Sequence, residues 1–388
     1  MRKIKIQMLA FSGADQEIYD KGMELLERFV PEDAFMFTHV NPDVLFFITG
    51  GSEKHAIEAC AKLDRVLLWS HDGDNSNAAA TEVKAYLDKK HTFSLLWSIQ
   101  QQGFANYVIN FQQTLSATDK LKDQQLGLIG NVSEWLVASE ISEKKLRERF
   151  GVFLAPISWD ALRPYSDFEP SGNFMQHFEG ASEDELVKAA RVHHLMTSTI
   201  EENHLDAITV ECFPLVKQHA VTACLSLSLL NDMGIPAGCE GDLTSITGMM
   251  LSKALTGEIA WMANTVKIEP DKVRFAHCTI ASKMVRAYNI MTHYETGLGT
   301  AIQGEINAEK LTVFRFDSEL KQAFISIGQV VDRPKLSNAC RTQVDLAMPE
   351  EDIKKLQTHP LGNHHLFLPG DHRKLIELAV LWSGMEVI

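Results

Sequence analysis

Residues 43–52 read Asp-Val-Leu-Phe-Phe-Ile-Thr-Gly-Gly-Ser, and this stretch is the strongest indicator of the fold. In its apolar run, the side chains that would point to either face of a strand are all apolar. We therefore expect a strand that is covered on both faces, as in a parallel sheet. The Gly-Gly-Ser that follows predicts a tight turn into a helix over residues 53–63. The stretch therefore predicts an α/β fold built on a buried parallel sheet.

The segments around this stretch extend the same pattern. Short apolar runs predict strands at residues 4–10, 44–49, 65–70 and 92–97. Between the first two runs, apolar residues and one glycine recur every three to four positions, which predicts one helical stripe over residues 18–29. The chain thus begins as strand, helix, strand.

A second α/β set is expected after the polar segment 116–125. Strand-like runs at 126–129, 152–157 and 207–211 alternate with helices expected over 142–150 and 182–200. The second helix opens with Ser182-Glu183-Asp184-Glu185, which is a capping box.

From about residue 264 the pattern changes to β segments. They are expected at 273–280, 312–316, 323–331 and 340–346, with a closing helix over 374–383. We therefore predict two Rossmann-like parallel α/β domains, residues 1–123 and 124–263, followed by a mainly β domain over 264–388.

Composition excludes several classes of function. The 388 residues are 45% hydrophobic and 23% charged, which is typical of globular domains. The 37 Lys and Arg against 51 Asp and Glu leave a net charge of -14, which disfavours nucleic acid and anionic membranes as partners. No signal peptide or long apolar run is visible, and six scattered cysteines without a Cys-x-x-Cys pair are typical of free thiols. We expect a cytoplasmic protein.

Carboxylates at the ends of expected strands are the first candidates for chemistry, because ligands of open α/β sheets bind there. Glu211 ends an uncharged strand and precedes Cys212-Phe213-Pro214. Gly238-Cys239-Glu240-Gly241-Asp242 comes just before an apolar helix. A cap for that helix explains Asp242 equally well, but it leaves Glu240 unexplained.

Two histidine segments complete the candidates. His277 lies within an expected strand, where a satisfied core imidazole is the alternative reading. Residues 362–372 read Gly-Asn-His-His-Leu-Phe-Leu-Pro-Gly-Asp-His, and three histidines and two glycines before a helix favour a site. Carboxylates and imidazoles without a thiolate motif match the ligands of Mn²⁺ or Mg²⁺ better than those of structural zinc.

At these residues the chain resembles the superfamily of L-fucose isomerase and L-arabinose isomerase, which are metal-dependent aldose–ketose isomerases. Residues 363–372 are similar to the fucose isomerase segment Asn-His-Gly-Val-Ile-Ser-Tyr-Gly-His with one residue inserted. This resemblance implies that His364 is a metal ligand. Glu240-Gly241-Asp242 is similar to the Glu-Asn-Asp segment, which implies Asp242 as a ligand and catalytic carboxylate, and Glu211 as the second.

The arabinose isomerases resemble the chain in a different register. Their segment Gly-Ala-His-Met-Leu-Glu is similar to Phe275-Ala276-His277-Cys278-Thr279, so His277 becomes an additional candidate ligand. In that register Glu240 replaces Asp242, and the sequence leaves both choices open.

The resemblance implies an enzyme that interconverts an aldose and its ketose by proton transfer through an enediol. The implied substrate is L-fucose, D-arabinose, L-arabinose or a related, for example sulfonated, sugar. The implied cofactor is Mn²⁺, with Mg²⁺ or Co²⁺ as substitutes, and the implied assembly is a homo-trimer or homo-hexamer. Two other classes stay open at this stage: a non-catalytic cytosolic sugar-binding protein, and a metal-dependent hydrolase or aldolase.

Overall fold

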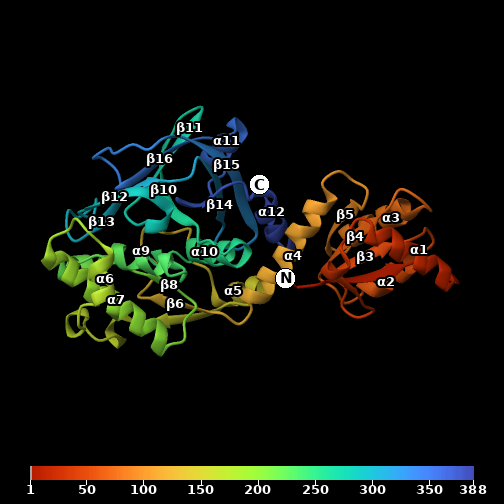
Figure 1. The fold of residues 1–388 in the computed structure, drawn as a ribbon, viewed down its shortest axis with the longest axis horizontal. Coiled ribbons are helices and arrows are strands. Elements are labelled where there is room, and N and C mark those ends of the chain that lie inside the picture. The colour runs from red at the N-terminus through yellow and green to blue at the C-terminus, as the bar shows by residue number, and fades with distance from the viewer. Residues whose placement is uncertain (1) are drawn as a thin grey trace. The chain divides into compact units, whose positions relative to one another are not determined.

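The computed structural model describes residues 2–388. The chain divides after Ala117, within its fourth α-helix, into two compact units. Both are α/β structures with parallel sheets, and the second unit also contains a mixed sheet, as Figure 1 shows. The α/β class predicted from the sequence is therefore confirmed.

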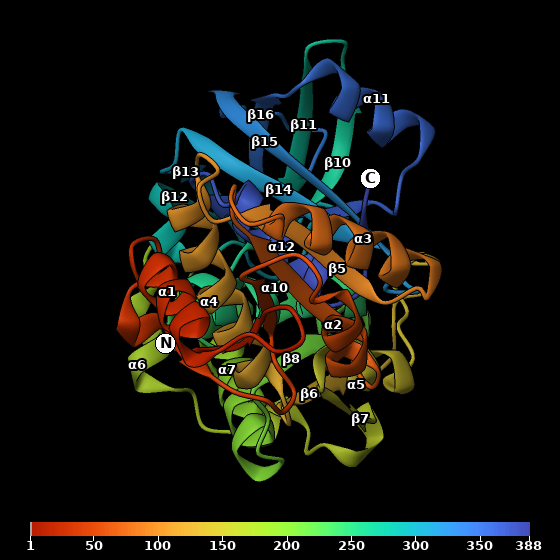
Figure 2. The ribbon, with the colours of Figure 1, turned by 90° about the vertical axis from the view of Figure 1, so that its right-hand side faces the viewer.

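The N-terminal unit is built on a five-stranded parallel sheet in the order β2-β1-β3-β4-β5. Its strands are β1 (Ile4–Leu9), β2 (Phe35–Phe37), β3 (Val44–Phe47), β4 (Arg65–Ser70) and β5 (Phe93–Ser98). Its helices are α1 (Gln16–Glu27), α2 (Glu53–Cys60), α3 (Ser76–Lys89) and α4 (Phe104–Leu121), and Figure 2 shows α2 beside α3. Every residue of β3 is buried, which confirms the expectation of a strand covered on both faces.

The second unit contains a four-stranded parallel sheet in the order β7-β6-β8-β9. Its strands are β6 (Gln125–Ile129), β7 (Phe153–Ile157), β8 (Ala207–Val210) and β9 (Ala237–Cys239). The chain moves outward from β6 to β7 and returns to β8 on the other side of β6. The direction of winding therefore reverses between β6 and β8, where ligands of such sheets usually bind.

Helices accompany this sheet in chain order. They are α5 (Glu143–Phe150), α6 (Gly172–His177), α7 (Glu183–Glu202), α8 (Phe213–His219), α9 (Cys224–Asp232) and α10 (Leu243–Thr256). The capping box of α7 is confirmed in part, because the Ser182 hydroxyl accepts a hydrogen bond from the backbone N–H of Glu185.

The rest of the second unit is mainly β. Its strands are β10 (Trp261–Ile268), β11 (Lys272–His277), β12 (Val285–Met291), β13 (Ala301–Ile306), β14 (Lys310–Phe316), β15 (Gln322–Asp332), β16 (Thr342–Ala347), β17 (His364–Pro369) and β18 (Glu386–Val387). Two helices, α11 (Glu350–Thr358) and α12 (Arg373–Trp382), complete it. Because β14 pairs with both β17 and β15, the strands β14-β17-β10-β11-β16-β15 close into a barrel.

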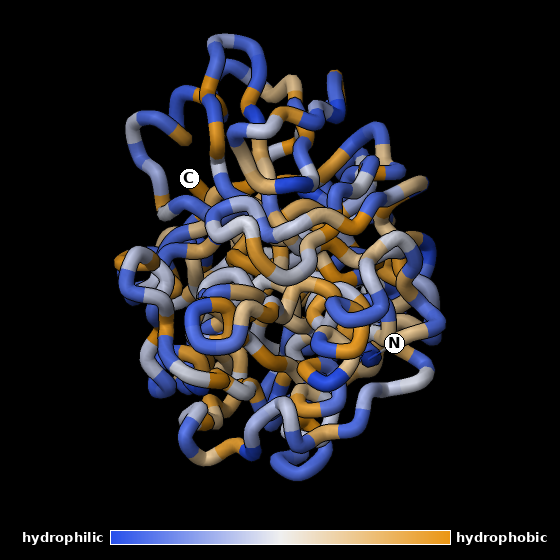
Figure 3. Tube along the Cα trace, turned by 90° about the vertical axis from the view of Figure 1, so that its left-hand side faces the viewer, coloured by the Kyte–Doolittle hydropathy of each residue, from blue (hydrophilic) through white to orange (hydrophobic). Residues whose placement is uncertain are grey.

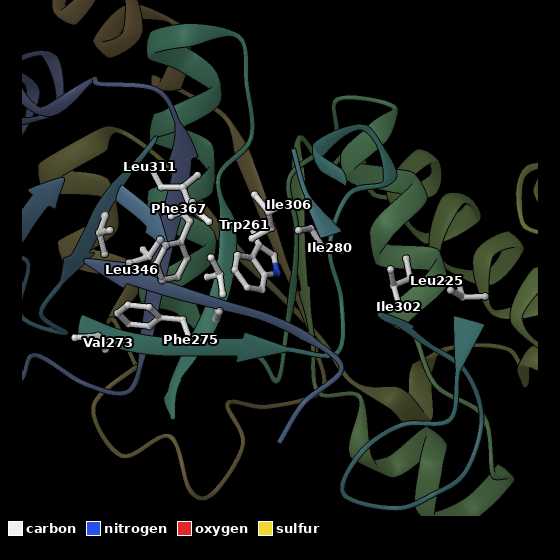
Figure 4. Packing of buried hydrophobic residues seen from close by; sticks show 14 of the residues in the cluster. Leu225, Trp261, Val273, Phe275, Ile280, Ile302, Ile306, Leu311, Leu346 and Phe367 are labelled. Carbon is white, nitrogen blue, oxygen red and sulfur yellow. The ribbon is translucent and has the colours of Figure 1, made fainter. Parts of the chain in front are cut away.

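A dense apolar core fills this β region. Figure 4 shows Trp261, Phe275 and Phe367 packed together, with Phe275 and Phe367 in an edge-to-face contact of 4.7 Å between ring centroids. Figure 3 shows the complementary pattern, since the outermost loops are mostly hydrophilic.

Helix α10 connects the barrel to the parallel sheet. It contacts β8 and β9 on one side and β14 and β17 on the other. Gly248 permits this approach, because a Cβ atom there would lie 2.2 Å from Cδ1 of Leu366. The helix therefore brings the barrel strands close to the carboxyl ends of the parallel strands.

Most of the expected strands and helices occur within a few residues of their predicted bounds, but β10 was not expected. Strand β10 begins at Trp261, so the expected boundary at residue 263 falls inside a strand. The expected boundary at residue 123 follows the end of α4, and the three-domain division stays a prediction. Among residues 2–388, no helix has the length and apolar character that crossing a membrane requires.

Candidate metal site

Two of the candidate carboxylates lie at the carboxyl edge of the four-stranded sheet. Glu211 directly follows β8 and Glu240 directly follows β9, and these strands are neighbours. The loop after β6 joins them, because the backbone N–H of Asn131 donates to Glu211 Oε2 at 2.8 Å and that of Ser133 donates to the Glu240 carbonyl at 3.0 Å. The sheet therefore places Glu211 at the strand end predicted from the sequence, and it places Glu240 at the end of β9, a strand that was not predicted.

The backbone around Glu240 has a strained conformation. Glu240 has a φ of 61° and Gly241 a φ of 67°, so two successive residues are left-handed. Gly241 is required there, because a Cβ atom would lie 2.2 Å from the carbonyl oxygen of Asn131. A left-handed non-glycine residue costs about 1–3 kcal/mol and is typical of functional sites.

Two histidines of the barrel meet the Glu240 side chain. His277 ends β11 and His364 begins β17, and both strands pair with β10. The Nε2 atom of each lies 3.8 Å from Glu240 Oε1, and the two ring centroids are 5.5 Å apart. The structure thus brings together a carboxylate and two imidazoles that are far apart in the sequence.

His364 is oriented by Asp242. Its Nδ1 lies 2.8 Å from Asp242 Oδ2, and since a carboxylate accepts, Nδ1 holds the proton of the neutral ring. The Nε2 atom is buried without a hydrogen-bond partner and faces Glu240. A carboxylate bonded to one ring nitrogen while the other is free to bind a metal is the usual arrangement of histidine ligands.

Asp242 itself has no free oxygen. It is the N-cap of α10, where Oδ1 accepts from the Thr244 hydroxyl at 2.7 Å and from the Ser245 N–H at 2.8 Å. Oδ2 accepts from His364 and, at 3.2 Å, from the Ser139 hydroxyl. Burial opposes ionisation of Asp242, but His364 and a nearby arginine outweigh it and lower its pKa. Asp242 is placed to position His364 rather than to bind a metal.

That arginine, Arg315, was not predicted from the sequence. It is 2% exposed, donates to the carbonyl oxygens of His364 at 2.5 Å and Ala138 at 3.1 Å, and lies 3.9 Å from Asp242 Oδ2. A signal existed, because a charged residue within the apolar run 312–316 must be paired when it is buried.

Electrostatics favour the charged form of Glu240. Burial opposes its ionisation, but the adjacent imidazoles of His277 and His364 outweigh burial and lower its pKa to about 2. Burial lowers the pKa of His277, yet Glu240 reverses this and leaves that pKa raised. The other oxygen of Glu240 accepts from the Trp135 indole N–H at 2.6 Å, and Trp135 is 50% exposed.

His277 is poised differently from His364. Its Nδ1 accepts a hydrogen bond of 3.3 Å from the Thr279 backbone N–H, so the proton of the neutral ring lies on Nε2, toward Glu240. Binding a metal through Nε2 would require His277 to give up this long hydrogen bond.

The other two histidines of the segment 362–372 lie outside the site. His365 alternates with His364 along β17 and therefore points into the barrel core, against the rings of Phe275 and Phe324. Burial lowers its pKa to about 3, so it is neutral. His372 precedes α12, and its Nε2 lies 2.9 Å from the Pro369 carbonyl oxygen.

A cysteine also lies close to Glu240, which was not expected from the sequence. Cys239 Sγ lies within 4.8 Å of ligand atoms of Glu240 and His277, and it is 3.2 Å from Cys212 Sγ. Hydrogen bonding to Cys212 and burial raise the pKa of the Cys239 thiol. The available signal was position, since Cys212 follows Glu211 and Cys239 precedes Glu240.

These residues could hold a metal ion. The separation of 3.8 Å between Glu240 Oε1 and each Nε2 exceeds the spacing of two atoms on one ion by roughly half an ångström, which small rotamer changes can close. Cys239, Glu240 and His277 have ligand atoms that all lie within 4.8 Å of one another, and His364 approaches this group through Glu240.

Comparison with models of known protein families finds no match for this chain, and comparison with curated proteins finds no significantly similar sequence.

Proposed function

We propose that the protein is a metal-dependent aldose–ketose isomerase. The observation that supports this best is the pair Asp242–His364, which aims a free, buried imidazole nitrogen at the Glu240 carboxylate. Support also comes from the position of Glu240 at the carboxyl edge of a parallel sheet, where the neighbouring strand is followed by a second carboxylate, Glu211.

The proposed ligands are Glu240 and His364, with His277 as the third. A carboxylate and imidazoles suit Mn²⁺, and Mg²⁺ or Co²⁺ are the proposed substitutes. When bound, a divalent cation would stabilise the negative charge that develops on the two sugar oxygens during enolisation. Asp242 takes the role of a positioning residue, and its hydrogen bond to His364 together with the charge of Arg315 keeps it ionised.

Glu211 is the proposed acid–base group. It is partly exposed, and its carboxylate accepts a hydrogen bond from the Asn131 N–H. This bond fixes one carboxylate oxygen at the carboxyl edge of the sheet. In the proposed reaction this carboxylate removes the proton from C2 of the aldose and returns it to C1, while the hydroxyl proton of O2 passes to O1, so that the carbonyl moves from C1 to C2 with no net gain or loss of protons. The exposed ring of Trp135 offers an apolar face for the carbon-bound hydrogens of a sugar.

The proposal includes the finer architecture. The N-terminal sheet and the four-stranded sheet would be the two Rossmann-like domains, and the barrel would be the C-terminal β domain of a homo-trimer or homo-hexamer. Sedimentation of the intact chain at micromolar concentration tests the assembly, and a monomer with full activity would contradict it.

The test of the activity is turnover by protein stripped of metal. Aldoses, including L-fucose, L-arabinose, D-arabinose and a sulfonated hexose, are incubated in D₂O with and without Mn²⁺, and products are followed by NMR. We expect a ketose and deuterium at the exchanged carbon only with metal. Full turnover after exhaustive chelation would refute the proposal. Sugar binding without turnover would favour a sugar-binding protein, and cleaved products would favour an aldolase or hydrolase.

A further inference from the structure

A second group of side chains with metal-binding character lies outside the proposed isomerase site. Cys278, Glu295 and Cys340 place their ligand atoms within 4.8 Å of one another. They come from three segments: the end of β11, the loop between β12 and β13, and the loop between β15 and β16. Their convergence is therefore produced by the tertiary fold rather than by a local turn.

Both thiols of this group are shielded from solvent, whereas the carboxylate reaches it. Cys278 and Cys340 are 3% and 7% exposed, and they pack with Ala276, Ala301 and Ala339. The Glu295 side chain is 43% exposed. An ion held here would have two buried sulfur ligands and one side open to water.

The carboxylate is held in place by a neighbour. Glu295 Oε1 lies 3.7 Å from Cys340 Sγ, and Oε2 lies 3.1 Å from Nε2 of the buried His293. The other nitrogen of His293 lies 3.2 Å from the Thr296 hydroxyl. Ligand carboxylates are commonly fixed by such outer hydrogen bonds, which orient the oxygen that faces the ion.

We propose that Cys278, Cys340 and Glu295 form a second metal site, which binds a thiophilic divalent cation such as Zn²⁺. Zinc–sulfur bonds of about 2.3 Å and zinc–oxygen bonds of about 2.1 Å put tetrahedral ligands roughly 3.4–3.8 Å apart, close to the Cys340–Glu295 separation. Two thiolates favour zinc over Mn²⁺ or Mg²⁺. Water fills the fourth position on the exposed side.

This site differs in chemistry from the proposed isomerase site, although His277 and Cys278 are consecutive. The first group offers a carboxylate and imidazoles, and the second offers two thiols and a carboxylate. A cation in the second site would tie two loops to the end of β11 and so fix the segment that presents His277.

The test uses Co²⁺ as a spectroscopic probe in the full chain, reduced and stripped of metal. Binding of Co²⁺ by thiolates gives an intense sulfur-to-cobalt charge-transfer absorption, which oxygen and imidazole ligands do not give. We expect this band in wild type and its loss in both Cys278→Ser and Cys340→Ser. Glu295→Gln, at an exposed position, should keep the band but weaken Co²⁺ binding at least about 10-fold. Zn²⁺ should displace the cobalt.

Two matched variants locate the sulfur ligands. Cys60→Ser changes a buried cysteine of the N-terminal unit and should leave the band intact. His364→Ala removes a proposed ligand of the isomerase site and should also leave it intact, so this result does not depend on the proposed function. Absence of the band in wild type would overturn the proposal. The proposal would also be overturned if the band is lost in Cys239→Ser but retained in both Cys278→Ser and Cys340→Ser.

Discussion

The two parallel sheets of this protein have similar architecture but very different carboxyl edges. In the N-terminal sheet, the polar groups after β3 and β4 satisfy one another. His71 Nε2 donates to the Ile48 carbonyl at 2.8 Å, His71 Nδ1 accepts from the Gly73 N–H at 3.1 Å, and the Ser76 hydroxyl donates to the Phe47 carbonyl at 2.5 Å. At the carboxyl edge of the four-stranded sheet, by contrast, the Nε2 atom of His364, which comes from the barrel strand β17 and faces Glu240, has no hydrogen-bond partner.

The contrast shows that the end of a parallel sheet is not enough to make a site. The four-stranded sheet supplies Glu211 and Glu240, but both imidazoles come from the barrel. A buried histidine whose two nitrogens are bonded stabilises the fold, whereas one with a free nitrogen beside a carboxylate can bind a ligand. The following predictions test this distinction.

The largest effect is expected from Asp242→Ala. The change removes the cap of α10 and leaves Arg315 and His364 buried without their carboxylate, and breaking a buried pair in this way costs about 3–5 kcal/mol. The matched change in the N-terminal unit is Asp15→Ala, which removes only the cap of α1 and should cost about 1 kcal/mol. Urea unfolding measures both. Equal losses would show that Asp242 is only a cap.

The second prediction concerns a buried histidine away from the site. Burial lowers the pKa of His193 in α7 to about 4, below its value of 6.5 in the unfolded chain. The folded state therefore binds fewer protons than the unfolded chain in this pH range. The stability that the neutral His193 contributes is fully present above pH 6.5 and is lost as the pH falls toward 4. The loss should reach roughly 3 kcal/mol.

The measurement compares unfolding free energies of wild type and His193→Gln across this pH range. The difference between the two proteins should change by the same amount. His39→Gln, which changes an exposed histidine of the N-terminal unit, is the control and should follow wild type. A pH dependence that His193→Gln leaves unchanged would show that burial of this ring is not its source.

Local patterns were enough to predict much of the fold. The apolar run at residues 43–48 and the capping box at Ser182 encode their elements in neighbouring residues, and both occur as expected. Strand β17 was missed, because residues 362–372 combine glycine, proline and histidine, and pairing with β10 and β14 makes this segment a strand.

The sequence was enough to name Glu211, Glu240, His277 and His364 as candidates, but it was not enough to predict their contacts. That Asp242 contacts His364 depends on how α10 packs between the sheet and the barrel, and no spacing along the chain encodes this. That His364 faces Glu240 while His365 enters the core depends on the register of β17. A shift of one residue would exchange the two histidines.

The third prediction tests the proposed base. Glu211→Gln keeps the shape of the side chain and its contact with Asn131 but removes the charge that accepts the proton. We expect kcat to fall at least about 100-fold with little change in KM, as for the loss of one acid–base group. Glu202→Gln, an exposed change near the end of α7, should leave kcat unchanged. A Glu211→Gln enzyme within twofold of wild type would exclude this residue as the base.

The final prediction compares the two histidines with which the contrast began. His364→Ala removes the free Nε2 from the carboxyl edge of the four-stranded sheet, so the affinity for Mn²⁺ should fall by about 10–100-fold or more, as for damage to a metal site. His71→Ala removes an equally buried ring from the N-terminal sheet, where both nitrogens are already bonded, so it should lower stability and leave Mn²⁺ affinity unchanged. Titration calorimetry on metal-stripped protein, with circular dichroism to confirm folding, measures both. Unchanged Mn²⁺ affinity in His364→Ala would show that this histidine is not part of a metal site. A loss of Mn²⁺ affinity in His71→Ala would show that burial of the ring, rather than the free nitrogen, explains the effect.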